Sequence, residues 1–321
     1  MTKTRILLAA LALAAAPLSS LAQAWPDKPV RLVVPYAPGG TTDFAARLVA
    51  ERLTQQTGTS FFVENRTGAS GTIATAQVAR SAPDGTTFLV NDTTYAMLPS
   101  LFAKLPWDHA NDLVPVTTLA VTPVVLVVAA NSPFKTAQEL VAYARKNPGR
   151  LNFGSGGTGS STHLSAEVLK KEGKLFITHI PYKGAGDAMV AVLGNQVDLL
   201  ITAAPTAVPQ VQGGKVRALA VTGDKPLPGL PGVPTFKEVG LPTYAVTNWF
   251  GLAAPKGTPK AIVDKLQAEV KKAVSDPKVL ERLNAMGAVP GGIPSADFSS
   301  LIQRETKLWS DVSKTAGVRA E

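Results

Sequence analysis

From residue 25 onward, short apolar runs alternate with segments whose apolar residues recur every three or four positions. Apolar runs bounded by turn-forming residues predict strands over residues 30–35, 60–63, 87–91, 121–129, 151–153, 176–180, 197–202, 216–221 and 248–254. The wider spacing predicts helices over residues 41–57, 71–82, 132–147, 161–172, 185–193, 208–212, 259–274, 276–286 and 298–314. This alternation predicts an α/β fold in which helices cover the faces of a parallel sheet.

The order of these elements predicts two lobes. The chain builds one α/β unit, then a second, and then ends in helices. We expect a discontinuous first lobe of residues 25–125 plus 246–321, and a second lobe of residues 126–245. The Pro- and Gly-rich residues 223–242 fit a surface crossover. The chain crossings at the lobe boundaries would form a hinge, and we expect the ligand in the cleft between the lobes.

Two glycine-rich loops, each between a predicted strand and a predicted helix, are the main candidates for a binding site. The first reads PYAPGGTTD over residues 35–43, and the second reads GSGGTGSS over residues 154–161. Gly lets a backbone approach a ligand closely, and N–H groups in the first turn of a helix attract anions. Because neither loop contains Lys or Arg, we expect a carboxylate held by backbone N–H groups and neutral hydroxyls. The candidate residues are Tyr36, Pro38, Gly39, Gly40, Thr41, Thr42, Asp43, Ser155, Gly156, Gly157, Thr158, Gly159 and Ser160.

The second loop has other interpretations. Gly154, Gly156 and Gly159 match the G-x-G-x-x-G pattern of dinucleotide-binding proteins. That pattern needs an acidic residue at the end of the next strand, and residues 179–183 contain none, so we expect no nucleotide cofactor. A purely structural turn stays open as an alternative to an anion site.

Three titratable residues have both a functional and a structural interpretation. Asp43 can cap the start of its predicted helix or contact the ligand, and Asp198 can cap a strand end or bind the ligand. His163 lies one turn into the helix that follows the second loop, where it can line the cleft or pack against its neighbours.

The first 24 residues have the pattern of an export signal. Lys3 and Arg5 precede an apolar stretch over residues 6–16, and residues 22–24 fit a small-x-small cleavage site. We therefore expect export to the periplasm and a mature chain that begins near Trp25.

Composition narrows the function further. The chain has no Cys, so an exported form would rely on packing rather than on disulfides. Its net charge is +9, but the Lys and Arg residues are scattered, which argues against nucleic-acid binding. No cluster has metal-ligand spacing and no G-x-S-x-G motif occurs. We expect no metal, no cofactor and no catalysis, although a hydrolase that uses Ser160 or Ser161 with His163 is an alternative.

A set of motifs extends over essentially the whole mature chain: residues 25–43, 63–66 with Gly68 and Gly71, 82–86, 152–159, 179–184, 249–255 and 257–259. In order and spacing these motifs resemble the Bug-type extracytoplasmic solute receptors, the binding proteins of tripartite tricarboxylate transporters. The resemblance implies a two-lobed periplasmic binding protein fold, similar to type II, that closes on a small organic carboxylate. It also implies that the two glycine-rich loops hold the carboxylate through main-chain N–H groups and ordered water.

By the same resemblance, more variable positions read the other end of the ligand, and they correspond here to Thr93, Thr94, Tyr182, Asp198, Ala203 and Ala204. We expect a periplasmic monomer that delivers its ligand to the membrane subunits of a tripartite tricarboxylate transporter. A ligand sensor for a signalling membrane protein would have the same site and is an alternative. The sequence leaves the identity of the acid open.

Overall fold

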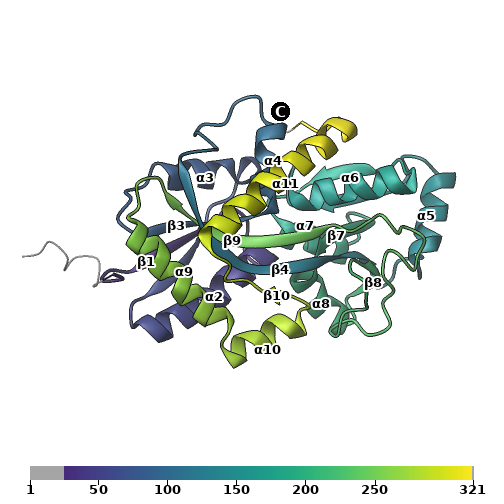
Figure 1. Ribbon diagram of the computed structural model, residues 1–321. Coiled ribbons are helices and arrows are strands. Elements are labelled where there is room, and N and C mark those ends of the chain that lie inside the picture. The colour runs from purple at the N-terminus through teal and green to yellow at the C-terminus, as the bar shows by residue number, and fades with distance from the viewer. Residues whose placement is uncertain (1–24, 320–321) are drawn as a thin grey trace, which may run out of the picture.

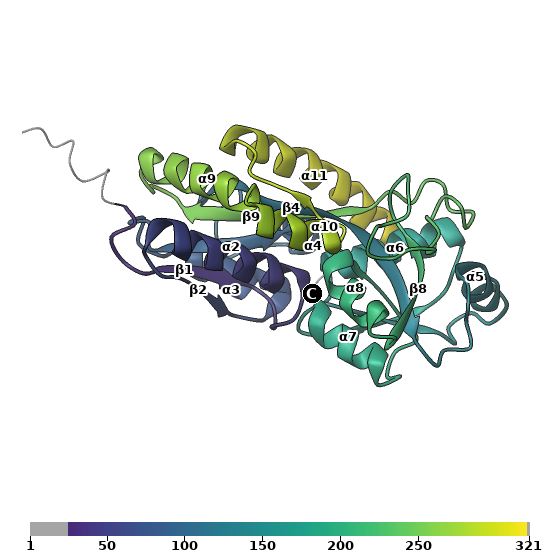
Figure 2. The ribbon, with the colours of Figure 1, turned by 90° about the horizontal axis from the view of Figure 1, so that it is seen from below.

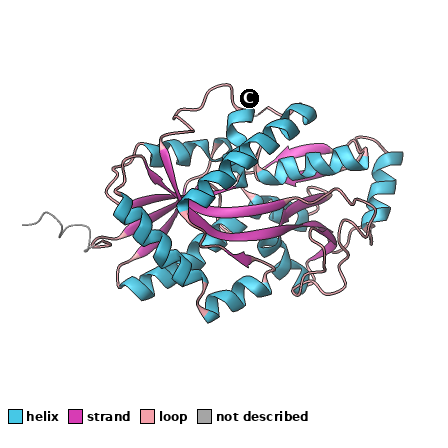
Figure 3. Cartoon of the chain, in the orientation of Figure 1, coloured by secondary structure: helices cyan, strands magenta, loops and turns pink. Residues whose placement is uncertain are grey.

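The computed structural model describes residues 25–319, and the predicted export signal lies outside the described residues. Figure 1 shows two groups of elements joined by long strands, and Figure 3 shows helices packed around the strands of both groups. The strands are β1 (Val30–Val34), β2 (Phe61–Asn65), β3 (Thr87–Asp92), β4 (Leu113–Ala129), β5 (Asn152–Ser155), β6 (Thr178–Pro181), β7 (Leu199–Ala203), β8 (Val216–Val221), β9 (Thr247–Pro255) and β10 (Val289–Pro290). The helices are α2 (Thr41–Thr57), the 3₁₀ turn η2 (Ala69–Gly71), α3 (Thr72–Ala79), α4 (Thr93–Leu101), α5 (Ala137–Lys146), α6 (Ser161–Gly173), α7 (Ala185–Leu193), α8 (Ala204–Gln212), α9 (Lys260–Val274), α10 (Pro277–Ala285) and α11 (Ser295–Ala316).

The strands form a mixed sheet that passes through both lobes. Its order is β2-β1-β3-β9-β4-β7-β5-β6, with β10 and β8 also paired to β4. β1 pairs in parallel with β2 and β3, and β5 pairs in parallel with β6 and β7. β9 runs antiparallel to both β3 and β4. The predicted parallel pairing is confirmed for the strands that alternate with helices within each lobe. β9 is antiparallel because it returns from the second lobe and enters the first lobe from the opposite end.

β4 is 17 residues long and takes part in both lobes. Residues 113–123 pair with β9, and residues 124–129 pair with β7 and β8 (Figure 2). Sequence analysis predicts only residues 121–129 as a strand, because the earlier part has no continuous apolar run. The chain thus crosses between the lobes inside β4 and again just before β9. The lobe boundaries near residues 125 and 245 stay predictions.

Helices cover both faces of the sheet in each lobe. In the first lobe, α2, α9 and α10 pack on the face that carries Leu32, while α3, α4 and α11 pack on the face that carries Val33. In the second lobe, α5 and α6 pack on the face of Leu126, and α7 and α8 pack on the face of Val127. Neighbouring residues of one strand point to opposite faces, so the central strands β1, β3 and β7 are buried on both faces.

Two helices differ from the prediction. No helix is predicted directly after the strand over residues 87–91, whereas α4 starts at Thr93, because the Asp92 carboxylate caps it and accepts the N–H of Thr94 at 2.9 Å. α9 begins at Lys260 with Pro259 as its N-cap, one residue after the predicted start. The Thr258 hydroxyl donates to the carbonyl of Pro255 at 2.8 Å.

The start of the described chain packs on the first lobe, and the last helix contacts both lobes. Trp25 is 5% exposed, and its indole N–H donates to the carbonyl of Gly85 at 2.9 Å. Near the other end, α11 packs Phe298 on the first lobe and Trp309 on the core of the second lobe. No helix between residues 25 and 319 has the length and the apolar character that crossing a membrane requires.

Candidate ligand-binding site

A pocket lies between the two lobes, where β1, β3, β5 and β7 reach their carboxyl ends. Such a position is the usual ligand site of α/β lobes. The first lobe contributes Tyr36, Gly40, Thr41, Thr42, Asp43, Asp92, Thr94, Asn248 and Phe250, and the second lobe contributes Gly156, Ser160, Ser161, Thr162, Ala185, Thr202 and Ala203.

The lobes touch each other around this pocket. The hydroxyls of Thr41 and Thr206 share a hydrogen bond of 2.8 Å. The N–H of Ser161 donates to the Thr94 hydroxyl at 3.0 Å, and the N–H of Ala37 donates to the carbonyl of Lys183 at 3.3 Å. These bonds join first-lobe groups to second-lobe groups, so the molecule is in a closed arrangement.

The first glycine-rich loop presents the start of α2 to the pocket. Gly40 is the N-cap of α2 and supplies no capping side chain, which leaves first-turn N–H groups for an anion. Thr41 and Thr42 line the pocket beside it, as predicted from the loop sequence. Their hydroxyls already bond Thr206 and Asp92, at 2.8 and 3.2 Å.

Asp43 lines the pocket but is tied into the first lobe. Its carboxylate accepts hydrogen bonds from Arg47 at 3.0 Å, from the Asn65 amide at 2.9 Å and from the N–H of Gly39 at 3.2 Å. Burial by itself would raise the pKa of Asp43, but these hydrogen bonds outweigh it and hold the pKa below its ordinary value. The structure thus gives this carboxylate a role in shaping the loop.

The second glycine-rich loop uses its N–H groups mostly within itself. Gly156 N–H donates to the Thr162 hydroxyl at 2.8 Å, Gly157 N–H to the Ser155 hydroxyl at 3.1 Å, and Gly159 N–H to His163 Nδ1 at 2.9 Å. The expected array of ligand-facing N–H groups is therefore smaller than sequence analysis predicts. The second lobe instead presents the N-cap Ser160 and the hydroxyl-bearing residues at the start of α6 to the pocket.

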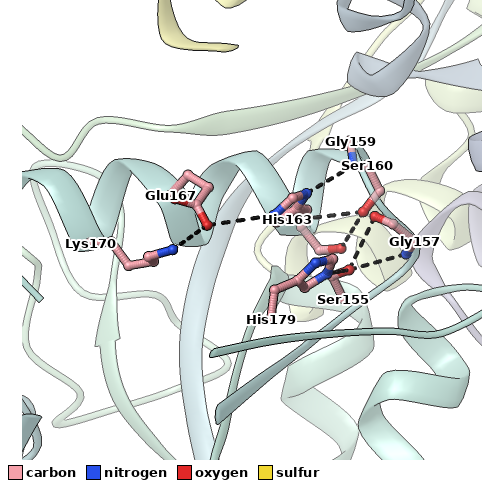
Figure 4. A network of polar contacts seen from close by, with 9 residues as sticks. Ser155, Gly157, Gly159, Ser160, His163, Glu167, Lys170 and His179 are labelled. Carbon is pink, nitrogen blue, oxygen red and sulfur yellow. Dashed lines mark hydrogen bonds and ion pairs between the residues drawn. The ribbon is translucent and has the colours of Figure 1, made fainter. Parts of the chain in front are cut away.

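Two stacked imidazoles, those of His163 and His179, contact the second glycine-rich loop (Figure 4). The rings of His163 and His179 lie 3.7 Å apart and nearly parallel. His163 Nδ1 accepts the Gly159 N–H, and Nε2 lies 3.5 Å from Glu167, while His179 Nε2 lies 2.5 Å from the Ser155 hydroxyl. Burial, and then the neighbouring His163, lower the pKa of His179 to about 3. This cluster orders the loop, and its contacts favour the packing interpretation of His163 over a place in the pocket wall.

The same contacts disfavour a hydrolase that uses Ser160 or Ser161. The ring nitrogens of His163 face Gly159 and Glu167, and the Ser160 hydroxyl accepts the backbone N–H of His163 at 3.3 Å as a helix cap. The Ser161 hydroxyl accepts a bond from the Asn248 amide at 3.3 Å. Neither serine is paired with an imidazole base in this arrangement.

Asp92 is the main pocket residue that sequence analysis misses. It is 5% exposed, and its carboxylate accepts bonds from the Tyr36 hydroxyl at 3.1 Å, the Thr42 hydroxyl at 3.2 Å and the N–H of Thr94 at 2.9 Å. Burial raises its pKa above the ordinary value. The sequence did carry a signal for this residue, because an Asp at a strand end followed by Thr93 and Thr94 is typical of a helix N-cap. Other pocket residues absent from the predicted site are Ser161, Thr162, Ala185, Thr202, Asn248 and Phe250.

Several predicted site residues lie outside this pocket. Asp198 stands at the opposite end of β7 from Ala203, and its carboxylate accepts the N–H of Asn152 at 2.8 Å. It joins β5 to β7, which favours the structural interpretation of this residue over a ligand contact. Buried Thr93 accepts the N–H of Trp249 at 3.0 Å. Gly157, Thr158 and Tyr182 line a separate hollow between the lobes, next to the Pro35–Tyr36 segment. The residues of the predicted site that line the pocket itself are Tyr36, Gly40, Thr41, Thr42, Asp43, Thr94, Gly156, Ser160 and Ala203.

Among residues 25–319, no group of three His, Asp or Glu residues is placed so that it could hold a metal ion. The pocket's chemistry is that of hydroxyls, backbone N–H groups and two carboxylates.

Known proteins resemble this chain over most of its length. The family model described as tripartite tricarboxylate transporter family receptor matches residues 45–318. Protein BugT of Bordetella pertussis is 34% identical over 307 residues, which cover 95% of this chain and 94% of BugT. The structure of periplasmic binding protein BugD is similar with a TM-score of 0.88 and 35% identity, covering 92% of this chain and 99% of BugD. R. palustris Rpa4515, solved with adipate, has a TM-score of 0.88 and 37% identity, covering 92% of this chain and 99% of Rpa4515. These similarities confirm the predicted periplasmic binding protein fold and the Bug-type resemblance.

Proposed function

This chain belongs to the tripartite tricarboxylate transporter receptor family, and we propose that it is a periplasmic receptor that captures a small organic carboxylate between its lobes. The observation that carries the proposal is the pocket itself, whose walls come from both lobes and are rich in hydroxyl groups and first-turn N–H groups. Such donors hold a carboxylate without a permanent counter-charge. The adipate bound by Rpa4515 supports a carboxylate as the ligand class.

We further propose that the receptor is exported and passes its ligand to the membrane subunits of a tripartite transporter. Capture and release then need no chemical step, because a ligand that contacts both lobes shifts the equilibrium between open and closed forms. The buried Trp25 supports a mature chain that starts at or just before this residue. Cleavage further along would remove an indole that packs on Phe61 and Phe88.

A thermal-shift screen of residues 25–321 tests this proposal. The panel contains mono-, di- and tricarboxylates from C4 to C6, each with its amide as a control. A ligand at 100 times its Kd adds about 2.7 kcal/mol of stability, which raises the Tm of a protein of this size by roughly 5 °C or more. We expect a rise with at least one acid and none with its amide.

A pocket variant serves as the control. Gly40→Val places a branched side chain next to Ala185 and the backbone of Gly186, which lie 3.8 and 3.6 Å from a Cβ at this position. The backbone at Gly40 has φ −84°, so the variant should fold and lose the shift. A protein that is free of co-purified ligand and shows no shift with any acid would contradict the proposal.

A further inference from the structure

Asp92 has a buried carboxylate that faces the pocket without a cationic partner. Its side chain is 5% exposed, and no Lys, Arg or His among residues 25–319 forms an ion pair with it. The other pocket carboxylate, Asp43, differs because Arg47 pairs with it at 3.0 Å. A buried charge is costly unless it is paired, so Asp92 is the one pocket group in the described chain whose charge is left to a ligand.

The hydrogen bonds around Asp92 favour its ionised form. The Tyr36 hydroxyl, the Thr42 hydroxyl and the Thr94 N–H all donate to the two carboxylate oxygens. The Thr94 hydroxyl also favours the charged form of Asp92, so this carboxylate has several hydrogen-bond donors around it, while its negative charge has no cationic partner in the described chain. Protonation would place a hydrogen atom on one carboxylate oxygen, and that oxygen would then lose a hydrogen bond from one of these donors. Burial still raises the pKa of Asp92, which means that a nearby cation would relieve an existing electrostatic cost.

The described residues of the pocket near Asp92 offer hydrogen-bond acceptors and no cationic side chain. None of the residues that line the pocket is Lys, Arg or His. In the sheet, Asp92 at the end of β3 pairs with Phe250 of β9. Asn248 lies on β9 two residues before Phe250. The side-chain amide oxygen of Asn248, Oδ1, is buried and has no hydrogen-bond partner among the described residues. A second ligand carboxylate would meet an uncompensated Asp92 here, whereas an ammonium group would meet two acceptors.

We propose that Asp92 receives an ammonium group of the ligand, so that the pocket prefers an amino acid to the plain carboxylic acid of the same skeleton. This inference rests on the proposed function, because it assigns the second end of the ligand that the carboxylate-binding loops capture. Asp92 is then the residue that sets specificity within the carboxylate class.

Calorimetric titration with matched pairs tests this inference. Succinate is compared with aspartate, glutarate with glutamate, and adipate with 2-aminoadipate; each pair differs by one ammonium group. We expect the wild-type protein to bind the aminated member of at least one pair about tenfold or more tightly, the range for a hydrogen bond to a charged group. In Asp92→Asn that preference should disappear, because Asn keeps the size and the helix-capping oxygen but has no charge.

Asp198→Asn is the matched control, since it removes the same charge from a carboxylate that lies outside the pocket and should keep the preference. If Asp92→Asn does not fold, Asp92→Ser, which also caps a helix, takes its place. Plain acids that bind the wild type as tightly as their amino acids would overturn this inference and leave the proposed function intact. A preference that survives in the folded Asp92 variant would also overturn it. If no acid of either series binds, both proposals fail.

Discussion

His179 shows how a residue remote from the ligand can control the binding loop. Its ring stacks on His163, contacts the Ser155 hydroxyl and lies near Glu167 and Lys170. Burial lowers its pKa from 6.5 to about 3, so the folded protein keeps this imidazole neutral at any pH near neutrality. A neutral ring avoids the cost of burying a charge, which is the main reason that the pKa of His179 is low.

Stability should therefore fall as the pH drops below about 6.5. The unfolded chain takes up a proton on His179 there, and the folded protein does so only near pH 3, so protons favour unfolding in this window. After a discount for partial exposure, we expect His179 to contribute a loss of about 1 kcal/mol between pH 7.5 and pH 5. Urea unfolding at both pH values should show a smaller loss for His179→Gln. His109, whose pKa burial lowers to about 4, acts in the same direction, so the dependence should weaken rather than vanish. An equal loss in both proteins would refute this role.

The start of α7 fits closely against the backbone of the opposite lobe. A Cβ on Gly186 would lie 2.7 Å from the carbonyl oxygen of Pro38, and one on Gly184 would lie 3.2 Å from the N–H nitrogen of Ala37. Both neighbours are backbone atoms of the first glycine-rich loop, which cannot move aside like a flexible side chain. Glycine is therefore needed here for the close approach of two lobes in the closed form.

Gly186→Ala should weaken ligand binding without weakening the fold. Overpacking costs about 1–3 kcal/mol, so we expect the Kd to rise at least about fivefold, while Ala favours the helix by up to about 1 kcal/mol. Calorimetry measures the Kd, and thermal unfolding without ligand measures the stability. Gly194→Ala at the other end of α7 is the control, since its Cβ would find no atom closer than 3.5 Å. Unchanged affinity in Gly186→Ala would mean that the closed contact is not part of the bound state.

The two lobes move as units only if the connections between them can bend. β4 and β9 run side by side across the junction, and their pairing ends at Pro123 and Thr247. β4 has further irregularities in register on both sides of this point, at Pro115–Thr117, Thr118–Ala120 and Leu126–Val127. Such irregularities bend and twist strands, which makes this region a candidate hinge.

Ligand should make the whole molecule more compact. Without ligand, the closed form of the described chain buries the Asp92 charge with no cation and the Asn248 side-chain oxygen with no hydrogen-bond donor, so we expect the free protein to populate an open form. Small-angle X-ray scattering should give a radius of gyration near the compact value of roughly 19 Å with a saturating acid, and a larger one without it. Gly186→Ala should need at least about fivefold more acid to reach the same compact value. Superimposable scattering curves with and without ligand would exclude this closure.

Local patterns in the chain were enough to predict the α/β class, the two lobes' succession of elements and much of the pocket. α7 and β8 have the predicted bounds. Their apolar periodicity and the Gly residues beside them are local signals, because they involve only a few neighbouring positions. Gly40, Thr41 and Ser160 were predicted at the pocket for a similar local reason, because a loop between a strand and a helix exposes its N–H and hydroxyl groups at one sheet edge.

Contacts between distant segments were not predictable in this way. The direction of β9, the acceptor role of Asn248 and the placement of Asp92 in the pocket depend on pairing between residues about 160 positions apart. His163 and Asp198 have the residue types of a binding site, yet their partners Gly159 and Asn152 hold them in structural roles. Sequence patterns carry the local conformational preferences of the backbone, whereas the partner of a buried polar group is chosen by packing, which brings together residues that no local pattern relates.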